Sequence, residues 1–198
     1  MSMYPYLLVF MLLTGYAIFF APGAGGSEDA IFQALIRGEF DAVDPLVTAV
    51  FSSLGVYPFI FLMILTRIDT YRIPAWPFAL FSFGLGAFAV LPWLIIRGKQ
   101  IRSEPRGPKL WHTVLRSKIL IGVLTAVSLS LFVTAFFGSL AQYGDAFMAS
   151  HLVSVMTVDL FVIFWMMYTL FKYELGFKQP LIAVIPLIGP LGLFLKSS

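Results

Sequence analysis

Residues 151–168, HLVSVMTVDLFVIFWMMY, form an apolar run that is interrupted by one carboxylate, Asp159. A run of about 20 apolar residues is long enough to cross a bilayer as a helix. The rest of the chain has the same character, with 60% hydrophobic and only 12% charged residues. A soluble domain of 198 residues could not hide this much apolar surface in one core. The sequence therefore predicts an all-α fold, a polytopic transmembrane helical bundle.

We expect about six spans in a single integral membrane domain that covers residues 1–198. Their predicted ranges are 4–21, 46–66, 75–96, 119–138, 151–171 and 181–195. The first is interpreted as a retained span, because no positively charged segment precedes it as in a signal peptide. The last is short and contains Pro186 and Pro190. It is consistent with a kinked span, a locally thinned crossing or a re-entrant segment, of which we favour a span.

The third predicted span carries two further signals. Ala79, Ser82 and Gly86 recur at steps of three and four, which predicts a face of small residues where another helix can approach closely. Trp76 and Trp93 lie 17 residues apart, about the spacing of the two interfacial aromatic belts of a membrane. Both signals favour one continuous crossing.

The first loop, residues 22–45, is expected to contain a short amphipathic helix on the membrane surface. Ser27, followed by two acidic residues, predicts the helix start, because a hydroxyl caps the helix and negative charge suits the positive end of its dipole. Phe32, Leu35 and Ile36 are expected on one apolar face. Gly38 predicts the end of the helix.

Lysine and arginine predict the orientation of the bundle, because they are enriched in cytoplasmic loops. With six spans, ten of these residues fall on the side opposite the N-terminus and three fall on the same side as it. The three are Arg67, Arg72 and Lys196. The expected location is a bacterial plasma membrane or a thylakoid, with both termini on the non-cytoplasmic side.

Asp159 is the candidate site residue that the composition singles out. His151 is expected near the outer mouth of its span, with Asp159 about 12 Å deeper and Ser154 about one turn below His151. An acid at mid-membrane depth must face the bundle interior, find donors or take up a proton. Asp159 is thus the candidate catalytic residue, and His151, Ser154 and Asp159 are candidates for binding a cofactor. The structural alternative is an aspartate that hydrogen-bonds a serine or threonine on a neighbouring helix and fixes packing.

A basic segment follows the third predicted span and is a candidate contact for lipid head groups or a partner protein. Its residues are Arg97, Lys99, Arg102, Arg106, Lys109, His112, Arg116 and Lys118. The alternative is that these charges only set the orientation. With two histidines and no cysteine, no metal site is predicted. A pigment needs a single histidine ligand, so His151 is also a candidate pigment ligand, and no nucleic-acid motif is present.

Residues 44–97 contain DPLVTAVFSSLGVYPFIFLMIL and IPAWPFALFSFGLGAFAVLPWLIIR. With the later VDL and IPLIGPLG segments, this chain resembles a family of uncharacterised multi-span membrane proteins of cyanobacteria and plastids. That resemblance implies a thylakoid or plasma-membrane protein, and it assigns no catalytic residues in this chain. DLFV at 159–162 and GPLGL at 189–193 resemble the neoxanthin-synthase-like family, which acts on carotenoids. The charged residues that follow DLFV in that family are replaced here by IFWMMY.

Together these patterns predict an integral membrane factor. It is expected to associate with a larger, photosynthetic membrane complex or to bind a pigment or lipid in the bundle, with carotenoid and chlorophyll as candidate cofactors. The alternatives are a small intramembrane enzyme acting on a lipid-soluble, carotenoid-like substrate, and a transporter with a polar site at Asp159. The expected partners are membrane lipids and another membrane protein complex, and no nucleic acid.

Overall fold

The computed structural model describes residues 3–197, and the described chain is helical, with isolated bridges but no strand. The helices are α1 Tyr4–Gly15, α2 Ala30–Arg37, α3 Pro45–Ile68, α4 Trp76–Leu85, α5 Ala87–Ile96, α6 Lys109–Leu115, α7 Lys118–Phe136, α8 Leu140–Ala149, α9 His151–Thr169 and α10 Ile188–Ser197. Turns of π-helix extend α1 through Tyr16–Phe20 and α9 through Leu170–Glu174. The all-α prediction is confirmed.

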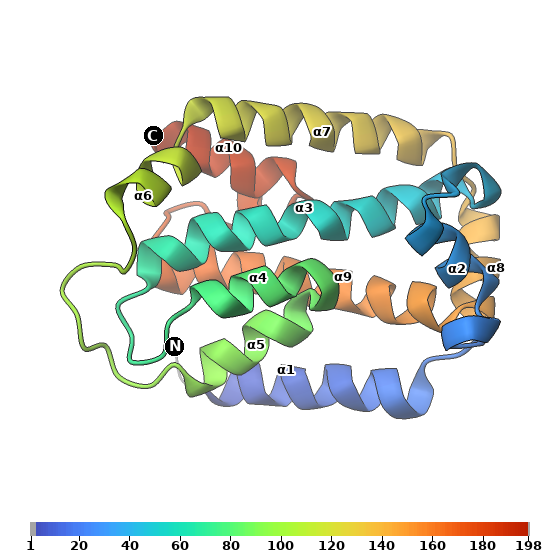
Figure 1. Ribbon diagram of the computed structural model, residues 1–198, viewed down its shortest axis with the longest axis horizontal. Coiled ribbons are helices and arrows are strands. Elements are labelled where there is room, and N and C mark those ends of the chain that lie inside the picture. The colour runs from blue at the N-terminus through green and yellow to red at the C-terminus, as the bar shows by residue number, and fades with distance from the viewer. Residues whose placement is uncertain (1–2, 198) are drawn as a thin grey trace.

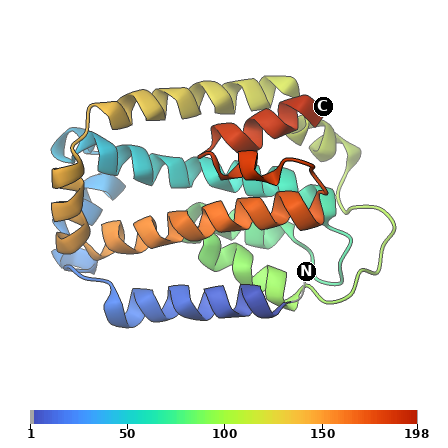
Figure 2. The same ribbon diagram turned by 180° about the vertical axis from the view of Figure 1, so that it is seen from behind.

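Four of these helices, α1, α3, α7 and α9, run side by side along the long axis of the molecule (Figures 1 and 2). Three helices are long and apolar enough to cross a membrane, namely Pro45–Ile68, Lys118–Phe136 and His151–Glu174. Tyr4–Phe20 is a shorter apolar helix, as are α4 and α5. The predicted ranges 46–66, 119–138 and 151–171 thus each correspond to one long helix, and the range 4–21 corresponds to one shorter apolar helix.

The predicted span 75–96 is two short helices that fold back on each other. The chain reverses at Gly86, whose φ of 52° and ψ of −128° are open to glycine because it has no Cβ. Tyr71 and Gln100 then meet in an antiparallel bridge, and the Arg72 amide donates to the Lys99 carbonyl over 3.2 Å. The two helices form a hairpin whose tip lies midway along the bundle (Figure 1). The prediction of one crossing here is wrong.

The predicted span 181–195 also turns back. A 3₁₀ turn, Pro180–Val184, leads inward, and α10 returns to the end of the bundle from which the segment came (Figure 2). At the reversal Leu187 adopts a φ of 56°, and its amide donates to the Tyr57 hydroxyl over 3.2 Å. Pro186 and Pro190 remove two backbone donors here, so a continuous helix is disfavoured. The favoured prediction of a sixth span is therefore wrong, and the path of the chain is that expected of a re-entrant segment.

These reversals gather the charged residues at opposite ends of the bundle. We call the end formed by residues 67–75, 97–118 and 172–180 and the last turn of α10 the basic end, and the end formed by residues 22–45 and 137–150 the acidic end (Figure 1). Twelve of the thirteen lysines and arginines belong to segments at the basic end. The prediction that Arg67 and Arg72 lie opposite Arg97 is wrong, because the hairpin brings all three to the same end.

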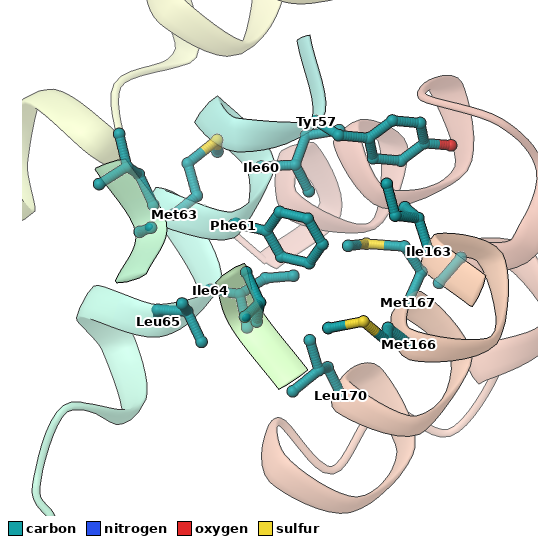
Figure 3. Packing of buried hydrophobic residues seen from close by; sticks show 14 of the residues in the cluster. Tyr57, Ile60, Phe61, Met63, Ile64, Leu65, Ile163, Met166, Met167 and Leu170 are labelled. Carbon is teal, nitrogen blue, oxygen red and sulfur yellow. The ribbon is translucent and has the colours of Figure 1, made fainter. Parts of the chain in front are cut away.

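Part of the main core lies between α3 and α9 (Figure 3). Phe61 and Ile64 of α3 meet Met166, Met167 and Leu170 of α9, and each of these side chains is 0% exposed. The unbranched methionines fill the irregular space beside the Phe61 ring. This packing holds α9 firmly against α3 and so fixes where Asp159 can point.

The short helix expected in the first loop is present as α2, with its cap two residues later than predicted. Its cap is Asp29, which accepts from the Phe32 amide over 2.9 Å, whereas Ser27 lies in a preceding 3₁₀ turn. Gly38 ends the helix with a φ of 76°, as predicted. Leu35 is buried while Ile36 is 55% exposed, so the prediction that they share one apolar face is wrong.

Candidate functional site

Asp159 caps the second helix of the hairpin. The amide of Ala87, the first residue of α5, donates to Asp159 Oδ1 over 3.1 Å and lies 3.3 Å from Oδ2. The first amides of a helix have no acceptor within the helix and carry the positive end of its dipole, so a carboxylate is a suitable partner. A Cβ on Gly86 would collide with the same carboxylate. Asp159 is only 4% exposed.

A crevice of about 420 Å³ opens beside this cap, between α3, the hairpin tip and α9. Its lining is largely apolar and is formed by Phe51, Ser52, Leu54, Gly55, Ser82, Phe83, Gly84, Leu85, Gly86, Phe88, Leu152, Val155, Met156 and Asp159. The Ser82 hydroxyl donates to the Ala79 carbonyl over 2.7 Å and is therefore occupied. The carbonyl end of α4 and the amide end of α5 both meet the crevice, so opposite partial charges converge there.

His151 lies apart from this crevice and ties α9 to α1. Its Nε2 lies 2.8 Å from the Ala17 carbonyl oxygen and, because a carbonyl only accepts, donates to it. Ala17 belongs to the π-helical turn, where a carbonyl bonds the amide five residues later. That position is Pro22, which has no N–H, so the Ala17 carbonyl is free for the histidine.

Ser154 performs a similar role one turn along α9. Its hydroxyl is 2.6 Å from that of Tyr16 on the turn that extends α1, and the serine is 0% exposed. The structure thus assigns His151 and Ser154 to the contact between α1 and α9, and only Asp159 to the crevice. The three candidate site residues share one helix but do not form one cluster.

A buried ion pair at the basic end was not predicted. Arg97 donates to both carboxylate oxygens of Glu174, over 2.9 and 2.7 Å, and its guanidinium lies 4.3 Å from the Tyr71 ring centroid. The Tyr71 hydroxyl also donates to Glu174, over 3.2 Å. Burial alone would lower the pKa of Arg97, but the hydrogen bonds and charge of Glu174 raise it above the ordinary value. The pair connects the end of α5 to the end of α9.

Arg97 therefore differs from the rest of the basic segment. It is 8% exposed and bound to Glu174, so it does not present its charge to lipid head groups. The residues whose side chains are exposed, as head-group contact requires, are Lys99, Arg102, Lys109, Arg116 and Lys118. Arg106 and His112 are partly buried, and the His112 Nε2 lies 2.9 Å from the Arg106 carbonyl.

Within the described residues, no group of three or more histidine, cysteine or acidic side chains is arranged to hold a metal ion. No family model, curated protein or solved structure matches the chain.

Proposed function

We propose that this protein is an integral membrane protein that binds an apolar, lipid-soluble molecule in the crevice at the hairpin tip. The crevice carries this proposal: it has a volume of about 420 Å³, lies beside the hairpin tip against the first halves of α3 and α9, and has a mostly apolar lining. Ligand pockets have this character, a predominantly apolar wall with a few placed polar groups. Because the Asp159 carboxylate is engaged with Ala87, contact area rather than an ionic anchor supplies the affinity.

In the proposed membrane, α1, α3, α7 and α9 cross, while the α4–α5 hairpin and the segment 180–197 enter and leave at the basic end. Irregular backbone at membrane depth is tolerated where it is buried in protein, and both reversals are packed against α3 or α9. The enrichment of lysine and arginine in cytoplasmic loops then favours a cytoplasmic basic end, with both termini there. This reverses the orientation expected from six spans.

Single cysteines test this topology directly, because the chain has none of its own. Arg72→Cys and Lys99→Cys, before and after the hairpin, are expected to react with an impermeant thiol reagent from the same, cytoplasmic side. Glu39→Cys at the acidic end, likewise exposed, is expected to react from the opposite side. Labelling in intact cells and in inverted vesicles checks all three. Labelling of Arg72→Cys and Lys99→Cys from opposite sides would restore a single crossing and contradict the proposal.

Filling the crevice tests the binding function. A Cβ at Gly55, which lines the crevice, meets no atom within 4 Å, so a side chain can begin there, and Gly55→Leu is expected to extend into the crevice. We expect this variant to fold and to lose most of the co-purifying lipid-soluble molecule. The measurement is mass spectrometry and absorption spectroscopy of an organic extract of protein purified in mild detergent.

Gly122→Leu on α7 is the matched control, because that Cβ also meets no atom within 4 Å and Gly122 does not line the crevice. It is expected to retain the wild-type ligand. Equal retention by the two variants would remove the crevice as the binding site.

A second function, an enzymatic or transport role for Asp159, is favoured by one observation. The carboxylate lines the crevice although it is 4% exposed. Asp159→Asn keeps an oxygen for the Ala87 amide but cannot transfer a proton. A binding protein retains its ligand in this variant, whereas an enzyme using a general acid or base loses its product and a proton-coupled transporter loses its flux.

Two finer parts of the proposal are supported by the family resemblance alone. They are a carotenoid-like ligand or substrate and a photosynthetic complex as partner.

A further inference from the structure

A second pocket lies at the basic end, away from the crevice. Its volume is about 340 Å³, and it is enclosed by the end of α3, the start of α4 and the N-terminal part of α6. Trp76 and Trp111 contribute aromatic walls, while Asp69 and Arg106 contribute charged groups. In the proposed membrane this pocket lies where the helices end, at the depth of the lipid head groups.

Two buried polar atoms in this pocket lack a hydrogen-bond partner among the described residues. They are Asp69 Oδ1 and Arg106 Nη1, which form an ion pair with each other at 3.5 Å but no hydrogen bond. The neighbouring atoms of both side chains are occupied, since Asp69 Oδ2 accepts from the Ala75 amide over 3.2 Å and Arg106 Nη2 donates to the Arg72 carbonyl over 3.0 Å. Asp69 is 2% exposed. Buried groups of this kind are rare in native proteins, and a missing ligand is one explanation.

A hydroxyl group fits these two atoms, because it donates to a carboxylate oxygen and accepts from a guanidinium at the same time. The opposite charges of Asp69 and Arg106 offset each other, which favours a neutral ligand over an ionic one. Burial also raises the pKa of the Asp69 carboxyl above its ordinary value, although the Ala75 amide and two arginines oppose that shift. Because burial already disfavours the charged form of this carboxyl, a negatively charged ligand is disfavoured beside it.

The tryptophans add an apolar surface to this polar pair. Trp76 is 49% and Trp111 is 50% exposed, and the two come from different elements, α4 and α6. Their rings can contact the apolar C–H face of a sugar while its hydroxyls reach Asp69 and Arg106. Tryptophan suits this position, since it has a large apolar body and is enriched at membrane interfaces.

We propose that the pocket at the basic end binds the neutral sugar head group of a glycolipid, with one hydroxyl bridging Asp69 Oδ1 and Arg106 Nη1. The inference rests on the proposed membrane location of the protein and is independent of what occupies the crevice.

Native mass spectrometry of the whole protein in a polyoxyethylene detergent, which contains no sugar, tests this. The probes are monoglucosyl diacylglycerol, phosphatidic acid and phosphatidylcholine with identical acyl chains, added in equal amounts. The glucolipid is expected to be retained about tenfold over the other two, the selectivity expected where two buried polar atoms otherwise make no hydrogen bond. Preference for phosphatidic acid would indicate an anion site and preference for phosphatidylcholine a cation site, and either would overturn the proposal.

Two variants assign the binding to the pocket. Asp69→Asn keeps an acceptor for Ala75 but presents an amide donor to the ligand, and Trp111→Leu removes one wall; both are expected to abolish the selectivity. Tyr173→Leu is the control, an aromatic residue at the same end that is also 50% exposed but lies outside the pocket. Wild-type selectivity in both pocket variants would overturn the proposal.

Two further measurements separate related outcomes. Complete displacement of the glucolipid by equimolar methyl glucoside would assign the pocket to a free sugar and overturn the lipid assignment. Gly55→Leu is expected to keep the glucolipid, so failure of the crevice proposal and failure of this one are distinguishable.

Discussion

Asp159→Leu is expected to destabilise the protein by about 2–4 kcal/mol, because it removes a helix cap and leaves a buried amide without an acceptor. The Ala87 amide lies at the tip of the hairpin, midway along the bundle, where its acceptor is Asp159 (Figure 1). Leucine has the same number of side-chain heavy atoms as aspartate and the same branching at Cγ, so the lost hydrogen bond should dominate. Asp159→Asn keeps an acceptor oxygen and is expected to cost less than about 1 kcal/mol.

Reversible unfolding in mixed micelles, titrated with a denaturing detergent, measures these free energies. Met156→Leu is the control, since Met156 is 4% exposed, lines the same crevice one turn away and has a volume close to that of leucine. If Asp159→Asn were as harmful as Asp159→Leu, the charge of Asp159 rather than its cap would be essential. That result would favour the proton-transfer function over the binding function.

The burial of Asp159 inside the bundle could be predicted from the sequence, but its partner could not. The cost of an acid within an apolar run indicates that it faces the bundle interior. Its partner is an amide that becomes free only because the helix breaks at Gly86. In the sequence, Gly86 belongs to a pattern of small residues that is equally typical of close helix packing. The structural alternative predicts a serine or threonine on a neighbouring helix as the partner of Asp159, whereas the partner is the backbone amide of Ala87.

The hairpin also explains why the aromatic spacing was misleading. Trp76 and Trp93 were interpreted as the two interfacial belts of one span. Both lie at the basic end, and Trp93 is 0% exposed, with its Nε1 donating to the Ile73 carbonyl over 3.0 Å. A separation of 17 residues in the sequence fits one crossing or two half-crossings equally well. Only contacts between distant residues, such as Tyr71 with Gln100, separate the two.

Local signals were more reliable than long-range ones. The approximate position of α2 and its end at Gly38 follow from residues within one or two turns. The ion pair between Arg97 and Glu174 joins residues 77 positions apart. Each residue lies in a segment where charged side chains are also expected simply because loops between helices are exposed to water. No periodicity connects them, so their pairing depends on the hairpin returning α5 to the end of α9.

Removing either member of that ion pair is expected to have the largest effect on stability. Arg97→Met leaves the Glu174 carboxylate, whose side chain is 7% exposed, without its guanidinium, and Glu174→Leu leaves the guanidinium without its carboxylate. Loss of one partner of a buried pair costs about 3–5 kcal/mol, chiefly because the remaining charge stays desolvated. Lys99→Met, two residues from Arg97 and exposed, is the control and is expected to change stability by less than about 0.5 kcal/mol.

The double variant Arg97→Met with Glu174→Leu gives the sharper test. Apolar replacement of both members of a buried pair is often nearly neutral, so the double variant should be more stable than either single variant. The coupling free energy from the four-protein cycle should reach about 2–3 kcal/mol, as for residues in direct contact. Additive losses would instead mean that each residue contributes through separate contacts, such as the Tyr71 ring that Arg97 covers. The ion pair would then not be what connects the hairpin to α9.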